Sequence, residues 1–344
     1  MKRYGVLIVG TGWVSGAHIQ AFQKDQRAFI AGIVSRNRER AKKKIEEFNL
    51  GESCTAYTDY EEALSDPRVD IAVICTPNDL HCRQAIQAAR AGKHILLEKP
   101  AALTWEDSLQ IHQEVQKAGV HSLVGYVLHF NPLFETAKNL QREFLGEIKY
   151  AETDYFHRIE DDLSCYSWNK TKEVGGSSLL AGGCHAVDAM RWFMQEEVES
   201  VYAQSMKIRE DFEFPGTTVV LLRFKSGKIA KIGSSYDFIS PYVFNVRLCG
   251  TKGTMWNDKV WSPQMLSGQL DYMSLPVTLP DSADVSHHPF PKQASHLLDC
   301  IEKDVETSCP VADALKTQEI IAAADLSAKT NQPVQLPLKR KTND

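Results

Sequence analysis

Two short segments, far apart in the chain, carry side chains suited to moving protons. Lys99 stands in the run Glu98-Lys99-Pro100, and His185 follows the glycine pair of Gly182-Gly183-Cys184. A lysine ammonium can stabilise negative charge that develops on an oxygen, and an imidazole titrates near neutral pH. Pro100 keeps Lys99 out of the helical region, which could aim its ammonium into a cleft. Taken singly, each residue could also be an ordinary surface or structural group.

A glycine turn near the N-terminus has the spacing of an anion-binding loop. The run from Gly10 to Ser15 follows the apolar segment Tyr4–Val9 and opens a helical pattern. The first glycine allows a tight turn, the second lets a diphosphate approach the backbone, and the helix start offers free N–H groups. Ser15 replaces the third glycine of the usual pattern. The context predicts a dinucleotide site made by Gly10, Thr11, Gly12, Trp13 and Val14.

The end of the second predicted strand indicates which dinucleotide binds. Enzymes that use NAD usually carry an acid here, which bonds the ribose 2′-hydroxyl. This chain instead reads Ser35-Arg36-Asn37-Arg38. Ser35 and Arg36 could hold a 2′-phosphate, with the guanidinium making charge-assisted hydrogen bonds. We therefore expect NADP, with NAD as the alternative if Arg36 only stacks on the adenine.

Later strand ends should complete the cofactor site. Ligands of open parallel sheets lie at the carboxyl ends of the strands, so Thr76, Pro77 and Asn78 should border the cofactor. His81, in the first turn of the next helix, is either a structural residue or a cofactor neighbour.

Taken together, these motifs resemble those of the glucose–fructose oxidoreductase/inositol dehydrogenase/rhizopine-catabolism (Gfo/Idh/MocA) family. The resemblance covers essentially the full length. Besides the segments above, it rests on Ala186-Val187-Asp188 after His185, on His288-Pro289-Phe290, Gln293 and His296, and on the closing run 334–338.

The resemblance implies hydride transfer between a nicotinamide and a hydroxyl or ketone of a sugar, cyclitol or related ring alcohol. It makes Lys99 and His185 the catalytic residues, with His185 moving the hydroxyl proton and Lys99 polarising the oxygen. It also brings Glu98 and Lys99 to the cofactor. Asp188, one helical turn after His185, either orients the substrate or His185, or is an ordinary acid of a first helical turn. A homodimer or homotetramer built through the C-terminal sheet is expected as well.

One departure from the family pattern concerns the acid. Members similar to inositol dehydrogenase carry an aspartate four residues before the histidine, where this chain has Ala181. Either Lys99 and His185 suffice, or an acid of the candidate substrate loop helps (Asp154, Glu160 or Asp161). Aromatic rings stack on sugar C–H faces, and Arg, His and Asp bond hydroxyls, although such residues also pack in sheets. The candidate substrate contacts are Tyr126, His129, Tyr155, His157, Arg158, Trp168 and Asp188.

The elements that must position these residues fall into two patterns, which predict two domains. Residues 1–125 alternate apolar strands with amphipathic helices, which is typical of an α/β Rossmann domain with a covered parallel sheet. Expected strands are 4–9, 29–35, 71–76, 94–98 and 122–126, and expected helices are 15–23, 38–48, 60–65, 80–91 and 104–118.

Residues 126–344 predict an α+β substrate-binding and oligomerisation domain with a large, mainly antiparallel open sheet. Strand-like segments follow one another there without intervening helices. The expected strands are 148–155, 201–207, 217–224, 229–237 and 242–249, with helices 131–142, 185–193, 292–303 and 312–329 over one face of the sheet.

Composition limits the other classes of function. The 344 residues carry a net charge of -5, which argues against a general nucleic-acid binder. Apolar runs fall far short of the ~20 residues of a membrane span, and the N-terminus does not read as a signal peptide. The scattered cysteines and histidines predict no metal site and fit reduced thiols in the cytoplasm. Two alternatives to a dehydrogenase stay open, an NAD-dependent glycoside-cleaving enzyme that acts by transient C3 oxidation and elimination, and a non-catalytic NAD(P)-binding regulator.

Overall fold

The computed structural model describes residues 2–163, 165–277, 279 and 288–339, and the chain divides into two compact units. The first unit comprises Met1–Val127 and Pro289–Leu315, and the second comprises Leu128–His288 and Lys316–Asp344. The predicted fold class, a Rossmann domain followed by an α+β domain with a large open sheet, is confirmed.

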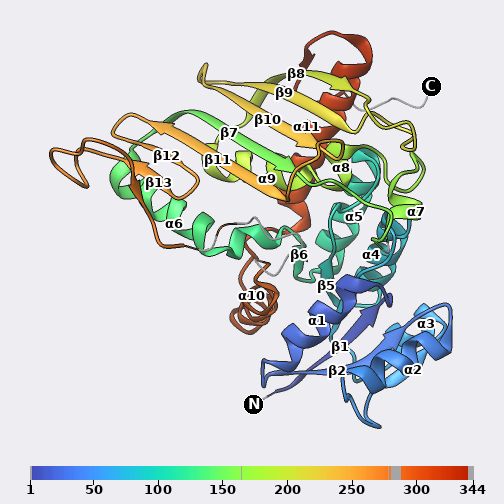
Figure 1. Ribbon diagram of the computed structural model, residues 1–344. Coiled ribbons are helices and arrows are strands. Elements are labelled where there is room, and N and C mark those ends of the chain that lie inside the picture. The colour runs from blue at the N-terminus through green and yellow to red at the C-terminus, as the bar shows by residue number, and fades with distance from the viewer. Residues whose placement is uncertain (1, 164, 278, 280–287, 340–344) are drawn as a thin grey trace. The chain divides into compact units, whose positions relative to one another are not determined.

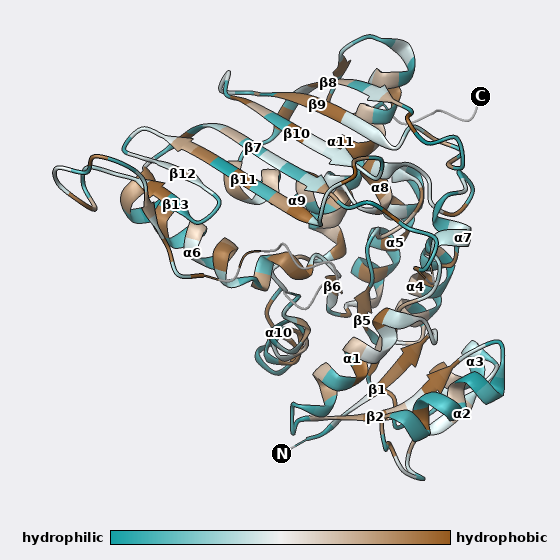
Figure 2. Cartoon of the chain, viewed as in Figure 1, coloured by the Kyte–Doolittle hydropathy of each residue, from teal (hydrophilic) through white to brown (hydrophobic). Residues whose placement is uncertain are grey.

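The first unit is built on a parallel sheet of six strands in the order β3-β2-β1-β4-β5-β6. Almost all residues of its central strands are apolar and buried, and Figure 2 colours these strands brown. Such burial is expected where helices cover both faces of a parallel sheet. The strands are β1 (Tyr4–Val9), β2 (Ala28–Val34), β3 (Thr55–Tyr57), β4 (Ile71–Ile74), β5 (His94–Leu97) and β6 (Ser122–Val124).

Helices of the first unit follow the strands, and three of them begin with a side-chain cap, from Asn37, Asp59 and Thr104. In α5 the Thr104 hydroxyl accepts the backbone N–H of Asp107 at 3.0 Å, and Gly119 ends the helix in the left-handed conformation. Exposed charges dominate α2, which buries only Ala41. The helices are α1 (Trp13–Gln23), α2 (Arg38–Glu47), α3 (Tyr60–Ser65), α4 (His81–Arg90), α5 (Trp105–Ala118) and α10 (Phe290–Lys303), with a 3₁₀ turn at Asn78–Leu80.

Helix α10 corrects one sequence prediction. Its periodicity suggested that it covers the second sheet, but it packs on α1 in the first unit. Arg27 fixes it there, donating to Asp299 at 2.6 Å and to the Ser295 hydroxyl at 2.9 Å. Periodicity shows that a helix has an apolar face but not which sheet that face meets, so the prediction was wrong.

The second unit contains a sheet of nine strands in the order β14-β13-β12-β11-β7-β10-β9-β8-β15. Neighbours are antiparallel except β7 and β10, which pair in parallel. The strands are β7 (Ile148–Phe156), β8 (Val198–Met206), β9 (Thr217–Phe224), β10 (Ile229–Ser235), β11 (Val243–Gly250), β12 (Thr254–Trp256), β13 (Lys259–Trp261), β14 (Met273–Ser274) and β15 (Val334–Gln335).

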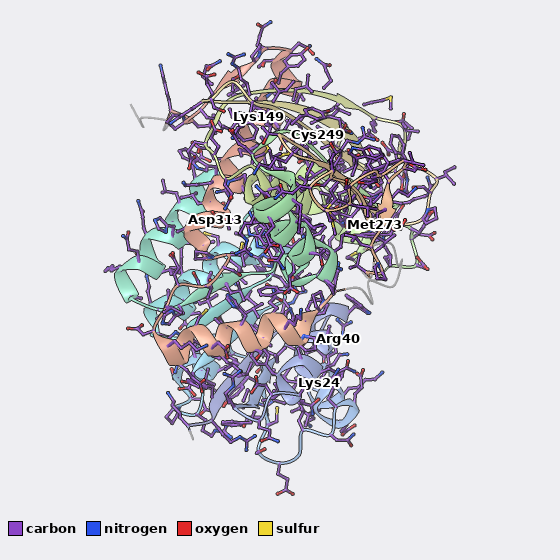
Figure 3. All side chains as sticks on the ribbon, turned by 90° about the vertical axis from the view of Figure 1, so that its left-hand side faces the viewer. Lys24, Arg40, Lys149, Cys249, Met273 and Asp313 are labelled. Carbon is purple, nitrogen blue, oxygen red and sulfur yellow. The ribbon has the colours of Figure 1, made fainter. Side chains whose placement is uncertain are left out.

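Helices cover one face of this sheet and leave the other open. Helices α8 and α9 pack on β7, β9 and β10, while the Ser327 hydroxyl of α11 accepts the Ala203 N–H of β8 at 3.0 Å. Figure 3 shows side chains along this sheet, with Lys149 of β7 and Cys249 of β11 labelled. The helices are α6 (Pro132–Leu140), α7 (Tyr166–Asn169), α8 (Ser178–Ala181), α9 (Cys184–Met194) and α11 (Val311–Thr330), with a 3₁₀ turn at Val127–Phe130 and a π turn at Gln141–Leu145.

Alternation along β9 shows which side chains the open face carries. Val220, Leu222 and Phe224 are buried, whereas Val219 and Leu221 are 45% and 53% exposed.

None of the described helices has the length and apolar character to cross a membrane.

Candidate functional site

The carboxyl edge of the first sheet gathers the predicted cofactor residues of the first unit. After β1 the chain passes to β2 and β3 on one side, and β4 then lies on the other side of β1. A crevice forms where the strand order reverses in this way, and dinucleotides bind there. The glycine turn follows β1, Thr76 to Asn78 follow β4, and Lys99 follows β5.

The glycine turn has the geometry that a diphosphate needs. Gly10 has φ of +110°, and a Cβ there would lie 2.6 Å from the Cys75 carbonyl oxygen, so only glycine fits. Gly12 begins α1 without a side-chain cap, and a Cβ on it would meet nothing within 4 Å among the described residues. The first turn of α1 contains no acid, and Trp13 is 58% exposed. Backbone N–H groups at this helix start can therefore bind an anion.

Ser15 explains why the third glycine can be replaced. Its side chain is fully buried, and its hydroxyl donates to the Gly12 carbonyl at 2.6 Å. Gly16 takes the close contact instead, since a Cβ there would lie 2.9 Å from the Phe48 ring that follows α2.

Ser35 and Arg36 lie at the end of β2, next to the glycine turn. The Ser35 hydroxyl is 3.4 Å from the Thr11 hydroxyl and accepts the Asn37 N–H at 3.3 Å. Arg36 is exposed, as are the basic residues that begin α2. Because it is exposed, the Arg36 guanidinium is accessible to a negatively charged group such as a phosphate.

His81 joins two loops of the carboxyl edge. It is 1% exposed, with Nδ1 2.7 Å from the Pro100 carbonyl oxygen and Nε2 2.9 Å from the Thr76 carbonyl oxygen. Of the two alternatives for His81, these contacts favour the structural one, because both ring nitrogens face backbone carbonyls. The imidazole thus holds the loop after β4 against the segment that carries Lys99.

Glu98 faces into the first unit rather than toward solvent. Its Oε1 lies 2.7 Å from Nε2 of His18, a residue of α1 that the sequence analysis did not single out. The signal was present, since His18 sits on the buried face of the helix that the glycine turn opens. Burial opposes ionisation of this carboxyl, but His18 and Lys99 together hold the pKa of Glu98 below its usual range.

In the second unit His185 lies among aromatic side chains. It is 3% exposed and begins α9, stacked on Tyr155 of β7 with ring centroids 5.9 Å apart. The Tyr155 hydroxyl lies 3.2 Å from Nδ1 of His157, and the His288 ring lies 6.1 Å from that of His185. Tyr242, which the sequence analysis did not single out, packs edge-on against both Tyr155 and His157.

Glycines let these groups approach one another. A Cβ on Gly182 would lie 2.6 Å from both Tyr155 and Tyr236, and one on Gly183 would lie 2.5 Å from the Ser234 hydroxyl. The glycine pair before His185 therefore serves close packing of α9 against β7 and β10.

Asp188 and His129 contact each other. The Asp188 carboxylate lies 2.5 Å from Nε2 of His129 and 3.4 Å from the Thr317 hydroxyl, and both members of the pair are buried. The His129 ring also stacks on Trp192 at 4.4 Å. These contacts tie α9 to the segment before α6, which is a role in packing that the sequence analysis did not assign to this pair.

The remaining candidates lie in varied surroundings. Arg158 pairs with Glu160 and donates to the Asp237 carbonyl at 2.8 Å. Asp154 forms an ion pair with Lys231 at 2.7 Å. Trp168 is half-buried on the short helix α7, and Asp161 is exposed. Two further residues are buried, namely Ala181 at the end of α8 and Tyr126, which belongs to the first unit.

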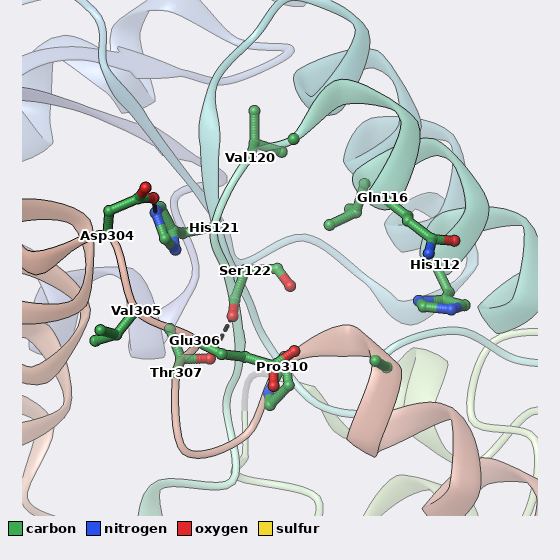
Figure 4. A pocket seen from close by; sticks show the side chains of 13 residues that line it. His112, Gln116, Val120, His121, Ser122, Asp304, Val305, Glu306, Thr307 and Pro310 are labelled. Carbon is green, nitrogen blue, oxygen red and sulfur yellow. Dashed lines mark hydrogen bonds and ion pairs between the residues drawn. The ribbon is translucent and has the colours of Figure 1, made fainter.

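A hollow of about 290 Å³ in the first unit lies elsewhere (Figure 4). It is lined by the end of α5, the start of β6 and the segment 304–312, with His121 3.1 Å from Asp304. This is the amino edge of the parallel sheet, opposite the edge that carries the glycine turn and Lys99. The hollow is therefore separate from the candidate site.

Comparison with known proteins covers both units of the fold. Residues 4–126 match the oxidoreductase family with an NAD-binding Rossmann fold, and residues 134–256 match the GFO/IDH/MocA C-terminal domain. A D-xylose 1-dehydrogenase (NADP(+)) of Haloferax volcanii is 30% identical over 243 residues, which is 70% of this chain and 72% of the relative.

Two further matches extend the comparison. A myo-inositol 2-dehydrogenase of Thermotoga maritima is 27% identical over 74% of this chain and 75% of the relative. The structure of levoglucosan dehydrogenase in complex with NADH aligns over 98% of this chain and 100% of its own, with a TM-score of 0.88 and 22% identity, and so shares the fold. From the two family matches and the relatives, this chain belongs to the GFO/IDH/MocA family and is an NAD(P)-dependent dehydrogenase.

Proposed function

We propose that this enzyme moves a hydride between a nicotinamide and a hydroxyl or ketone of a sugar, cyclitol or related ring alcohol. The observation that carries the proposal is the position of Lys99. It follows β5 at the sheet edge where the uncapped glycine turn after β1 offers an anion site. A cofactor with its diphosphate at that turn and its adenosine toward β2 would direct its other end toward β4 and β5.

Lys99 and His185 then have separate tasks. The bound nicotinamide supplies the hydride acceptor or donor. The Lys99 ammonium stabilises the negative charge that develops on the reacting oxygen, and His185 takes up or returns the hydroxyl proton. Burial raises the pKa of Tyr155, so its hydroxyl stays protonated, and its ring, stacked on that of His185, can orient the imidazole.

The substrate class is supported by the side chains of the second unit and by the relatives. Tyr155, His157 and Tyr242 offer ring faces and hydrogen-bonding atoms next to His185, which suits a molecule with both C–H faces and hydroxyls. Relatives include enzymes named for D-xylose and for two inositols.

For the cofactor we propose NADP in preference to NAD. Ser35 and the exposed Arg36 occupy the position where an acid would bond the ribose 2′-hydroxyl, and a guanidinium favours a phosphate. The relatives include both an NADP(+) and an NAD(+) enzyme.

A second candidate is cleavage of a glycosidic or anhydro bond by transient oxidation and elimination. It is favoured by Ala181, which replaces the acid of inositol-type members, and by relatives named 2,7-anhydro-N-acetylneuraminate hydratase, of which the Escherichia coli protein is 28% identical over 74% of this chain. In such a reaction the cofactor would be regenerated within each turnover.

We also propose that the enzyme forms a homodimer or homotetramer through the open face of the second sheet. Val219, Leu221 and Ile229 lie on that face and are 45–54% exposed. Apolar side chains exposed together on one face, unlike single exposed ones, are typical of a protein–protein interface. The scattered cysteine spacing supports a cytoplasmic location.

One experiment separates the two activities. Purified protein is incubated with a panel of sugars, inositols and glycosides, with and without added NAD or NADP. Net formation of reduced cofactor supports the dehydrogenase, and release of an aglycone or hydrated product without added cofactor supports the second candidate. Absence of both reactions across the panel would contradict the proposed substrate class.

A further inference from the structure

A buried hydrogen-bonded pair, His18 and Glu98, lies next to Lys99 in the first unit. His18 of α1 is fully buried, and its Nε2 is 2.7 Å from Oε1 of Glu98. The other carboxylate oxygen of Glu98 accepts the backbone N–H of Lys99 at 3.2 Å. On its other side the His18 ring meets the edge of Phe290, with centroids 5.0 Å apart. The helix that opens at the glycine turn is thereby joined to the backbone that carries Lys99.

The fold makes room for Glu98 and keeps it charged. A Cβ on Gly125 would lie 3.0 Å from Oε2 and 3.2 Å from Cα of Glu98, so the glycine after β6 leaves the space that the carboxylate fills. A buried carboxylate is costly unless it is paired and hydrogen-bonded. Four titratable groups of the first unit interact electrostatically with the Glu98 carboxylate, namely His18, Lys99, His81 and the Cys75 thiol.

We propose that His18 and Glu98 are positioning residues for Lys99, with His18 holding the carboxylate and Glu98 fixing the Lys99 backbone. Helix α1, which begins at the glycine turn, would then fix the position of Lys99 relative to that turn. The consequence for turnover rests on the proposed catalytic role of Lys99, whereas the effect on the lysine itself can be measured without substrate or cofactor.

The first test follows the reactivity of the Lys99 amine in the protein without cofactor. Reductive methylation consumes neutral amines, and mass spectrometry of the peptide that contains Lys99 gives its rate at a fixed pH. Glu98→Gln keeps the shape of the side chain but removes the charge that strengthens its hydrogen bond to the Lys99 backbone N–H. The Lys99 segment should then be held less firmly, and the methylation rate should rise by about tenfold. His121→Gln is the matched control, because it disrupts a His–carboxylate pair at the opposite edge of the same sheet and should leave the rate unchanged.

The second test uses two replacements of His18. His18→Phe fills the space without a donor, so Lys99 methylation should accelerate and kcat should fall by about tenfold or more, with the KM for the cofactor changed less than about threefold. In His18→Gln an amide donor can still reach Glu98, and both properties should recover most of the way to the wild type.

Methylation rates of Lys99 that match the wild type in folded Glu98→Gln would overturn the inference, and the isosteric change keeps this result accessible if His18→Phe fails to fold. A loss of kcat in His18→Phe that His18→Gln does not rescue would also contradict it. Lack of turnover with every sugar would instead count against the proposed function and leave the methylation result standing.

Discussion

Gly10 and Gly12 stand two residues apart in one turn, yet alanine should mainly lower stability at Gly10 and mainly weaken cofactor binding at Gly12. Gly10 has φ of +110°, and its added Cβ would lie 2.6 Å from a carbonyl oxygen and 3.0 Å from a carbonyl carbon of Cys75, which is backbone that cannot move aside. Gly12 has φ of -72°, which alanine adopts freely, and its Cβ would enter open space. Gly10→Ala therefore tests the fold, and Gly12→Ala tests the anion site.

The environment of each glycine sets the expected loss of stability or of cofactor affinity. At Gly10 the strained backbone costs about 1–3 kcal/mol, and the close contact adds about 1–3 kcal/mol. A sum of about 2–6 kcal/mol corresponds to a fall in Tm of roughly 5–15 °C. At Gly12 the loss of a tolerated N-cap costs about 0.5–1 kcal/mol, or roughly 1–3 °C. A methyl group where a diphosphate should approach would weaken NAD(P)H binding by about 10–100-fold.

Thermal unfolding of the protein without cofactor, together with titration of NAD(P)H fluorescence, measures both quantities on the same samples. Gly12→Ala should melt close to the wild type and lose cofactor affinity, and Gly10→Ala should melt well below both. Wild-type affinity in Gly12→Ala would refute the placement of the diphosphate at this turn. A wild-type melting temperature in Gly10→Ala would refute the packing of the turn on Cys75.

Three further outcomes are expected. Lys99→Met should lower kcat by about a thousandfold while leaving cofactor affinity within about threefold, which stopped-flow and binding assays would check; near-normal rates would remove Lys99 from the mechanism. Arg36→Ala should weaken NADPH binding about tenfold and change NADH binding less than about twofold, and equal losses for both cofactors would count against 2′-phosphate recognition. Burial, reinforced by His121, lowers the pKa of His94 to about 4 from 6.5. The unfolded chain thus binds this proton more readily than the folded one, so stability should fall as pH drops from about 6.5 to about 4. His94→Gln should flatten Tm across that window, and an unchanged slope would show that His94 is not responsible.

Local patterns were enough to predict most of the fold. Strands β1 and β9 and helix α3 have the predicted bounds, and the other predicted elements differ from theirs by one to three residues, because apolar periodicity and glycine stops are properties of short segments. Short strands escaped detection, as with β3 and β12 to β15, since two or three residues carry no period. The glycine turn, Ser35 and Arg36, and the Lys99 segment follow strands of the first sheet, as predicted, because parallel strands bring their carboxyl ends to one edge.

Tertiary structure alone decided which polar side chains meet. The sequence proposed Glu98 for the cofactor and Asp188 and His129 for the substrate, but packing pairs Glu98 with His18 across 80 positions and Asp188 with His129 across 59. Burial forces such pairing, since a charge removed from water needs a partner, and the partner is set by how helices lie on strands rather than by spacing along the chain. The return of α10 to the first unit has the same origin, because an apolar helix face records that it is buried and not what buries it.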